Sequence, residues 1–173
     1  SLANDGAPDG TLVLAEHQSH GRGRLGRGWF APKGTCLLMS LVLRPRLLPQ
    51  EAQRAMMICS LAAVGAIART SGLAAQVKWP NDIVMHGRKL GGLLTELGVR
   101  ARHLDYVVVG VGLNVNVHLC ALPPLATPAT SLSIALGHPV SRLELLVALL
   151  EEIEVRYDRM SAGWSPHEEW REH

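Results

Sequence analysis

The chain has 173 residues, of which 47% are apolar and 18% charged, and its formal net charge is +2 with neutral histidines. This length fits one domain, and this composition excludes an intrinsically disordered chain. The weak positive charge argues against nucleic-acid binding driven by charge alone, and no apolar run reaches the ~18 residues that a membrane-spanning helix needs. We therefore expect one globular domain with neither a nucleic-acid nor a membrane partner.

Strand-like and helix-like patterns alternate in the first half of the chain. Residues 11–17 and 36–44 are short apolar runs that predict two buried strands, and a loop rich in glycine and arginine joins them. Pro49 begins a long helix in which apolar residues recur every three or four positions. Gly72 is placed to end this helix.

A block of short strands follows the long helix. The pattern predicts a strand over 76–79, a hairpin of strands over 82–86 and 89–99, and a buried, glycine-containing strand over 106–116. Because most of these strands are joined by hairpins, they do not form a regular βαβ repeat.

The last part of the chain is mostly helical. A proline-rich loop over 119–130 leads to a short helix over 131–136. Ser141 and Glu144 form a capping box at the start of a second long helix, and a further helical segment begins at Ser165. Together the elements predict an α+β fold, a mixed β-sheet backed by helices, in a single domain over 1–173.

Three cysteines, Cys36, Cys59 and Cys120, stand apart from one another without a Cys-x-x-Cys pair. An odd number of lone thiols is more typical of a reducing compartment than of a disulfide framework. The surroundings of all three are apolar, so they are expected to be buried core thiols. We expect the protein to be cytoplasmic.

The first motif is a loop with three arginines, Gly21-Arg-Gly-Arg-Leu-Gly-Arg-Gly28. It contains the spacing G-x-G-x-x-G, but a dinucleotide-binding fingerprint must run straight into a helix, and the residues from Trp29 onward begin none. Glycines let backbone amides approach an anion, and guanidinium groups match phosphate oxygens. The loop therefore predicts a clamp over a phosphate or carboxylate, with a solvated basic loop or a nucleic-acid arm as the alternative.

The second motif, Lys-Trp-Pro-Asn-Asp at 78–82, is followed by Lys-Leu-Gly-Gly-Leu at 89–93. Asn81 and Asp82 lie at a strand break, where side chains can face a pocket. Asp82 would orient a cation or hold a lysine, and the two glycines leave room for a ligand beside Lys89. The alternative is a plain hairpin with a Lys–Asp pair on its surface.

The third motif is Val-Gly-Val-Gly-Leu-Asn at 109–114, where two glycines interrupt a β-branched run. Glycine inside a strand is tolerated where a flat ligand approaches the backbone. Asn114 would then reach a phosphate or a ribose. The alternative is a β-bulge in the core.

Taken together and in this order, the three motifs resemble those of the biotin protein ligase family. The arginine loop, with Gln18 and Trp29, is similar to the family's biotin and adenylate loop. Residues 78–82 with 88–96 are similar to its central signature, and residues 110–116 to its third block. The resemblance implies a fold related to class II aminoacyl-tRNA synthetases. It also implies a reaction in which biotin and ATP form biotinyl-adenylate, which then acylates a carrier lysine.

The resemblance also implies roles for individual residues. Lys89, Arg24 and Asp82 are expected to be catalytic, with Lys89 at the biotin carboxylate and Asp82 placing Mg²⁺ or the attacking lysine. The residues expected to bind biotin are Gln18, Gly21, Arg22, Lys89, Gly92 and Gly110. Those expected to bind ATP or the adenylate are Arg22, Arg24, Arg27, Trp29, Lys78, Asn81, Lys89 and Asn114.

The implied partners are ATP and Mg²⁺ as cofactors, biotin as substrate, and a biotin carboxyl carrier domain, such as that of acetyl-CoA carboxylase, as acceptor. The resemblance is compatible with a homodimer. The family's upstream Ser-Thr-Asn segment and its small C-terminal β-barrel domain have no counterpart in residues 1–173, so the catalytic domain alone is expected. The alternatives are a lipoate or octanoyl ligase and a non-catalytic biotin-binding module.

Overall fold

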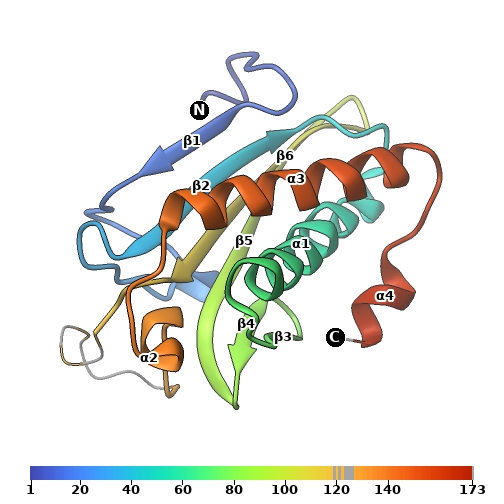
Figure 1. The fold of residues 1–173 in the computed structure, drawn as a ribbon. Coiled ribbons are helices and arrows are strands. Elements are labelled where there is room, and N and C mark those ends of the chain that lie inside the picture. Colours follow the sequence, from blue (N-terminus) through green and yellow to red (C-terminus); the bar gives the residue numbers. More distant parts are fainter. Residues whose placement is uncertain (119, 121, 123–126, 173) are drawn as a thin grey trace.

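Six strands form one sheet, and helices cover one of its faces (Figure 1). The computed structural model describes residues 1–118, 120, 122 and 127–172. Across the sheet the strands are β1 (Leu12–Ala15), β2 (Cys36–Leu43), β6 (His103–Asn114), β5 (Arg88–Arg100), β4 (Asp82–Met85) and β3 (Gln76–Lys78). Neighbouring strands pair antiparallel, and the parallel component is a bridge between Lys89 and Ala129. The predicted α+β fold, a sheet backed by helices, is confirmed.

Two long helices, α1 (Gln53–Ser71) and α3 (Arg142–Ser161), pack on the sheet. Gly72 follows α1 with φ at 70°, a left-handed conformation that glycine adopts without steric cost, so the predicted helix end is confirmed. The hydroxyl of Ser141 accepts a hydrogen bond from the Glu144 backbone amide at 3.2 Å, which is the serine half of the predicted capping box. The reciprocal contact of the Glu144 carboxylate is not found among the described residues. The shorter helices are η1 (Arg24–Gly26), η2 (Pro49–Glu51), α2 (Leu132–Leu136) and α4 (His167–Glu172).

Alternation along the strands divides their side chains between two faces. Successive residues of a strand point to opposite sides of the sheet. In β2 and β6 the odd-numbered residues join the core beneath the helices: Leu37, Met39, Leu41, Leu43, Val107, Val109, Val111 and Leu113. The even-numbered residues of the same strands face the other side, which leaves that side free to build a site.

Two predictions about burial are wrong. The strand predicted over 11–17 is the shorter β1, and Val13 and Leu14 are 41% and 51% exposed. β1 is an edge strand, so it has a neighbour on one side only. Cys120 is exposed, whereas Cys36 and Cys59 are buried as expected.

Two further sequence predictions concern the loop over 119–130 and membrane-spanning helices. Half of the residues of the predicted proline-rich loop, 119, 121 and 123–126, lie outside the described residues. Among the helices that are described, none has the length and apolar character to cross a membrane.

Candidate active site

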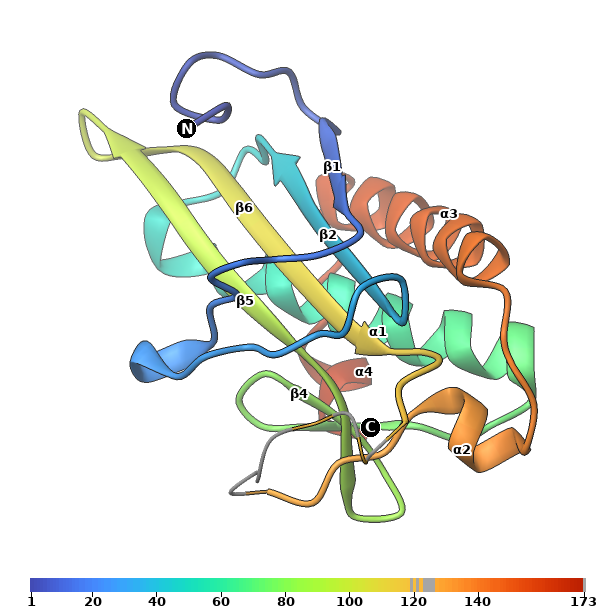
Figure 2. The same ribbon diagram turned by 90° about the vertical axis from the view of Figure 1, so that its left-hand side faces the viewer.

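The loop from Gln18 to Gly34 crosses the face of the sheet that the helices leave open (Figure 2). Between this loop and strands β2, β5 and β6 lies a pocket of about 520 Å³. Such a volume suits a small-molecule ligand. The pocket therefore brings the arginine loop, the 78–93 region and the glycine-containing strand β6 to one place.

The floor of the pocket includes three glycines that share one face of the sheet, Gly92, Gly110 and Gly112. Gly112 pairs with Gly92 on β5 and with Leu38 on β2, and Gly92 pairs in turn with Asp82. A Cβ on Gly112 would lie only 2.8 Å from the Trp29 ring, so the indole rests directly on that glycine. The absence of side chains at these positions lets a flat group lie against the strands.

The arginine loop is folded back on itself into a finger, residues 21–29. The backbone amide of Trp29 donates to the carbonyl of Gly21 at 2.8 Å, and that of Gly23 donates to the carbonyl of Arg27 at 2.7 Å. A Cβ on Gly21 would lie 2.2 Å from the Trp29 carbonyl oxygen, so this close approach requires glycine. The finger carries its own backbone hydrogen bonds, and its side chains are free to contact the pocket.

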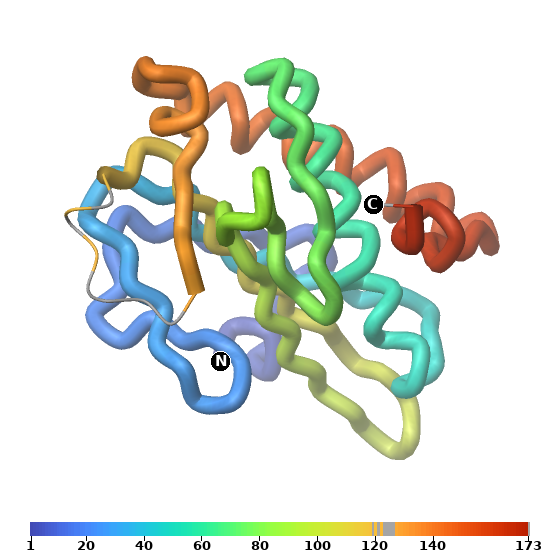
Figure 3. Tube along the Cα trace, turned by 90° about the horizontal axis from the view of Figure 1, so that it is seen from below, coloured from blue at the N-terminus to red at the C-terminus, as the bar shows by residue number. Residues whose placement is uncertain are grey.

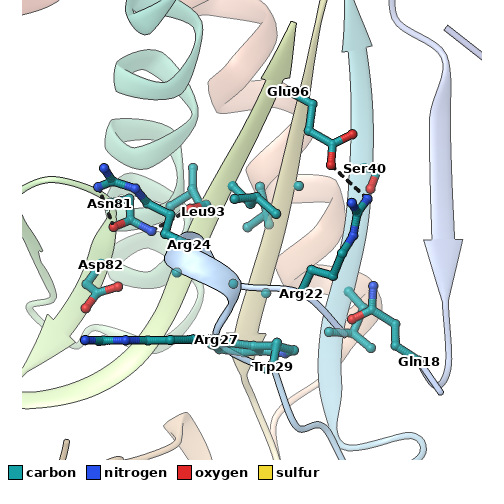
Figure 4. A pocket seen from close by; sticks show the side chains of 18 of the residues that line it. Gln18, Arg22, Arg24, Arg27, Trp29, Ser40, Asn81, Asp82, Leu93 and Glu96 are labelled. Carbon is teal, nitrogen blue, oxygen red and sulfur yellow. Dashed lines mark hydrogen bonds and ion pairs between the residues drawn. The ribbon is translucent and has the colours of Figure 1, made fainter. Parts of the chain in front are cut away.

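Three of the cations that line the pocket contact an oxygen of the protein, and Figure 4 shows the contacts of Arg22 and Arg24. Lys89 Nζ lies 2.6 Å from Asp82 Oδ1, and 5.9 Å from the centre of the Trp29 ring. Arg24 donates to Asn81 Oδ1 at 3.3 Å, on the β4 side of the pocket. On the opposite side, the Arg22 guanidinium forms an ion pair with Glu96 at 2.8 Å. The pocket thus holds positive groups that an incoming anion can attract away from weak protein partners.

The segment in front of α2 fixes the backbone of the central lysine. The Lys89 amide donates to the Pro128 carbonyl at 2.8 Å, and the Thr130 amide donates to the Lys89 carbonyl at 2.9 Å. Figure 3 shows this segment running beside the β4–β5 hairpin. Because both peptide groups of Lys89 are hydrogen-bonded, its ammonium is projected from a rigid support.

Most of the residues that the sequence pointed to are brought together by the fold. Those that line the pocket are Gln18, Arg22, Arg24, Arg27, Trp29, Asn81, Asp82, Lys89, Gly92 and Gly110. Three others, Gly21, Lys78 and Asn114, are not among the lining residues. Lys78 is exposed on the edge strand β3, and Gly21 shapes the finger from within.

Asn114 does not line the pocket, and its side chain contacts other parts of the protein instead. It is 5% exposed, its Nδ2 donates to the Thr130 carbonyl at 3.0 Å, and its Oδ1 lies 3.7 Å from the Cys36 sulfur. Burial raises the pKa of the Cys36 thiol. Asn114 therefore ties the end of β6 to the segment that supports Lys89, and its contact with adenylate stays a prediction.

Sequence reasoning missed several residues that line the pocket. They include His20, Leu38, Ser40, Trp79, Leu94, Glu96 and Val108. An alternation signal was present, because Leu38, Ser40 and Glu96 are even-numbered members of predicted strands. The sequence does not show how β2, β5 and β6 are aligned with one another, and that register determines which face of each strand borders the pocket.

The acidic residues that line the pocket are Asp82 and Glu96. No cluster of three or more His, Cys, Asp or Glu with metal-binding geometry occurs among the described residues. Mg²⁺ is commonly bound by one or two carboxylates together with substrate phosphates. Asp82 alone fits that pattern, and it is also the partner of Lys89.

The comparisons with known proteins agree with this geometry. The chain is 39% identical over 167 residues to the bifunctional ligase/repressor BirA of Bacillus subtilis (strain 168), covering 95% of this chain and 51% of that protein. It is 34% identical over 152 residues to the biotin–[acetyl-CoA-carboxylase] ligase of Mycobacterium tuberculosis, covering 86% and 54%. The chain thus spans about half the length of these curated relatives.

A solved structure of the biotin protein ligase from Aquifex aeolicus, in complex with biotin and ATP, superposes with a TM-score of 0.80 at 29% identity. The superposition covers 94% of this chain and 66% of that one. Residues 2–114 match the model of a family described as the biotin/lipoate A/B protein ligase family. These residues include the arginine finger, the Lys89 region and the glycine-containing strand, and the chain belongs to the biotin/lipoate A/B protein ligase family.

Proposed function

We propose that this chain is the catalytic core of a biotin protein ligase. In the first step a carboxylate oxygen of biotin attacks the α-phosphate of ATP, and pyrophosphate leaves. In the second step the amine of a carrier lysine attacks the acyl carbon of biotinyl-adenylate, forming an amide while AMP and a proton are released. The acceptor we propose is a biotin carboxyl carrier domain, such as that of acetyl-CoA carboxylase.

The observation that carries this proposal is the grouping of fixed cations over a glycine floor. Lys89, Arg24 and Arg27 line one pocket whose base includes Gly92 and Gly110. The first step joins two anions, a carboxylate and a triphosphate, so their repulsion must be offset by preorganised positive charge. The glycine floor leaves room for the bicyclic ring and apolar chain of biotin.

The two partners of the cations indicate how ligand binding would proceed. Asp82 holds Lys89 at 2.6 Å, and the Asn81 amide oxygen holds Arg24 at 3.3 Å. We propose that the biotin carboxylate, and later the adenylate phosphate, replaces these oxygens as the partner of Lys89 and Arg24. Asp82 would then be free to help hold Mg²⁺, which would offset the negative charge of the triphosphate, or to accept a proton from the acceptor lysine so that its amine can attack.

Trp29 is the proposed support for the adenine ring. Its indole lies flat on Gly112, and its Nε1 is buried without a hydrogen-bond partner among the described residues. Aromatic rings stack favourably, and a buried N–H gains from an acceptor. A bound adenosine could supply both contacts. The free thiols of Cys36, Cys59 and Cys120 fit a reducing compartment, and we propose a cytoplasmic location.

The deciding experiment is biotin-dependent exchange of labelled pyrophosphate into ATP, catalysed by this chain. A biotin ligase gives exchange with biotin and none with lipoate or octanoate. The reverse preference would assign the chain to the lipoate branch of the family. Retention of biotin without exchange would indicate a binding module and contradict the proposed activity.

A further inference from the structure

Glu96 is a pocket residue to which the motifs and the resemblance give no role. It lies on β5, on the same face as Gly92 and Leu94, and it lines the pocket. Its carboxylate is 2.8 Å from the guanidinium of Arg22. Because Asp82 is already paired with Lys89, Glu96 is the acidic lining residue that faces the finger.

The contacts of the finger with the sheet are few. The backbone hydrogen bonds described above lie within residues 21–29, so they hold the finger's shape but do not hold it over the pocket. The contacts that hold it there include the Arg22–Glu96 ion pair, the Arg24–Asn81 hydrogen bond and the packing of Trp29 on Gly112. Trp29 also packs against the small cluster that contains Leu38, and its ring lies near Lys89. Arg22 and Arg24 reach to opposite sides of the pocket (Figure 4).

The location of the Arg22–Glu96 pair separates it from the reacting groups. Asn81, Asp82 and Lys89 lie together on the β4 side, where the proposed carboxylate and phosphates would bind. An incoming anion can therefore draw Arg24 from Asn81 without removing the partner of Arg22. The Glu96 contact can persist while the ligand exchanges.

We infer that Glu96 is a positioning residue, which holds Arg22 and with it the finger over the pocket before ligands bind. The expected effect on catalysis rests on the proposed function, whereas the contact between Glu96 and Arg22 does not. The side chains of Arg22 and Glu96 are 73% and 50% exposed, so solvent screens their attraction. An exposed ion pair shifts an equilibrium by at most about 5-fold, so losing it weakens the closed position of the finger without abolishing it.

Loss of the Arg22–Glu96 contact is expected to weaken ligand binding but not to slow the chemical step. If the finger is closed in a smaller fraction of free molecules, the apparent affinity falls in proportion to that fraction. Once bound, the ligand's own anions close the finger, so the chemical step is unaffected. Loss of the Glu96 charge should therefore raise KM for biotin about 2- to 5-fold and leave kcat unchanged.

The test is amide hydrogen exchange of residues 21–28 in the protein without ligands, comparing Glu96→Gln with the unsubstituted chain. We expect exchange there to accelerate about 2- to 5-fold. Arg22→Gln should have the same effect, and the double variant should add nothing further, since the two substitutions remove one contact. Glu154→Gln, on the exposed face of α3, removes the same charge elsewhere and should leave the finger's exchange unchanged.

Salt gives a readout that a merely structural role would not move. Raising the salt concentration from ~50 mM to ~500 mM screens exposed charges, so exchange in the unsubstituted finger should approach that of Glu96→Gln, which should itself be insensitive. Unchanged exchange in Glu96→Gln, or additive effects in the double variant, would overturn the inference. Absence of biotin-dependent pyrophosphate exchange in the unsubstituted chain would reject the proposed function, while the hydrogen-exchange results would still decide the role of Glu96.

Discussion

The two faces of the sheet are made by the same strands yet hold opposite kinds of residue. On the helix side, Val109, Val111 and Leu113 of β6 are almost completely buried in the main core. On the pocket side, the residues between and beside them are Val108, Gly110 and Gly112. One strand therefore supplies stability through its odd-numbered residues and ligand space through its even-numbered ones. This comparison predicts that substitutions on the two faces will separate stability from activity.

The largest expected effect is on the core face. Leu113 is 1% exposed, belongs to the main core and is not among the residues that line the pocket, so Leu113→Ala removes buried methyl groups and leaves a cavity. We expect a loss of about 2–5 kcal/mol in the free energy of unfolding. Urea denaturation followed by circular dichroism measures it. The fraction of protein that remains folded should retain its KM for biotin, and a raised KM would show that the two faces are not independent.

Lys89→Ala tests the chemical centre of the pocket face. Removing a cation that stabilises charge in the transition state reduces the rate by about 10²–10³-fold. We expect biotin-dependent pyrophosphate exchange to fall by at least this factor while the unfolding transition is preserved, because Lys89 is partly exposed. Lys33→Ala, on an exposed loop residue, is the matched control. Full exchange activity in Lys89→Ala would contradict the assignment of this lysine.

Gly110→Val tests the pocket floor. The nearest atom to a Cβ at this position is the Leu94 carbonyl oxygen at 3.5 Å, an ordinary contact, so the strand itself can accept a side chain. The valine would instead project into the ligand space, where overpacking costs about 1–3 kcal/mol. Biotin affinity, measured by calorimetry, should fall about 5- to 150-fold, with little change in unfolding. A loss of stability like that of Leu113→Ala would make Gly110 a core residue.

The smallest expected effect concerns the reactivity of two buried thiols, one on the pocket side of the sheet and one in the main core. Cys36 belongs to a small cluster on the pocket side with Ala31, Leu38 and Val117, whereas Cys59 lies in the main core. Burial raises the pKa of Cys36, and it raises the pKa of Cys59 from 9.0 to about 12. At pH 8 both are therefore protonated and shielded in the folded protein. Exposed Cys120 should react with a disulfide reagent at once.

The same thiols give a pH dependence of stability. A thiol whose pKa is higher in the folded protein binds its proton more tightly there, so folding is favoured below the unfolded pKa. As the pH rises above about 9, the unfolded chain loses its Cys59 proton first, and the free energy of unfolding should fall. Thiol titration and urea denaturation at pH 8 and 10 measure the two effects. Reaction of Cys36 as fast as Cys120 would show that the pocket-side cluster opens readily.

The sequence alone predicted much of the local structure and most of the named residues that line the pocket. Helix ends were predictable because Gly72 and Ser141 act within a few residues of themselves. Lys89, Asp82 and the arginine finger were predictable because their residue types and spacing are what binding an anion requires. These features depend on neighbours in the chain, so a linear pattern contains them.

What only the tertiary structure decided depends on which strands are neighbours. The sequence could not show that β1 is an edge strand, so its apolar residues were expected to be buried. Nor could it show that Asn114 bonds to Thr130, or that Glu96 faces Arg22. A shift of one residue in register would move every side chain of a strand to the other face. Pairing between distant segments therefore determined which residues line the pocket, because burial and contact are properties of the assembled sheet.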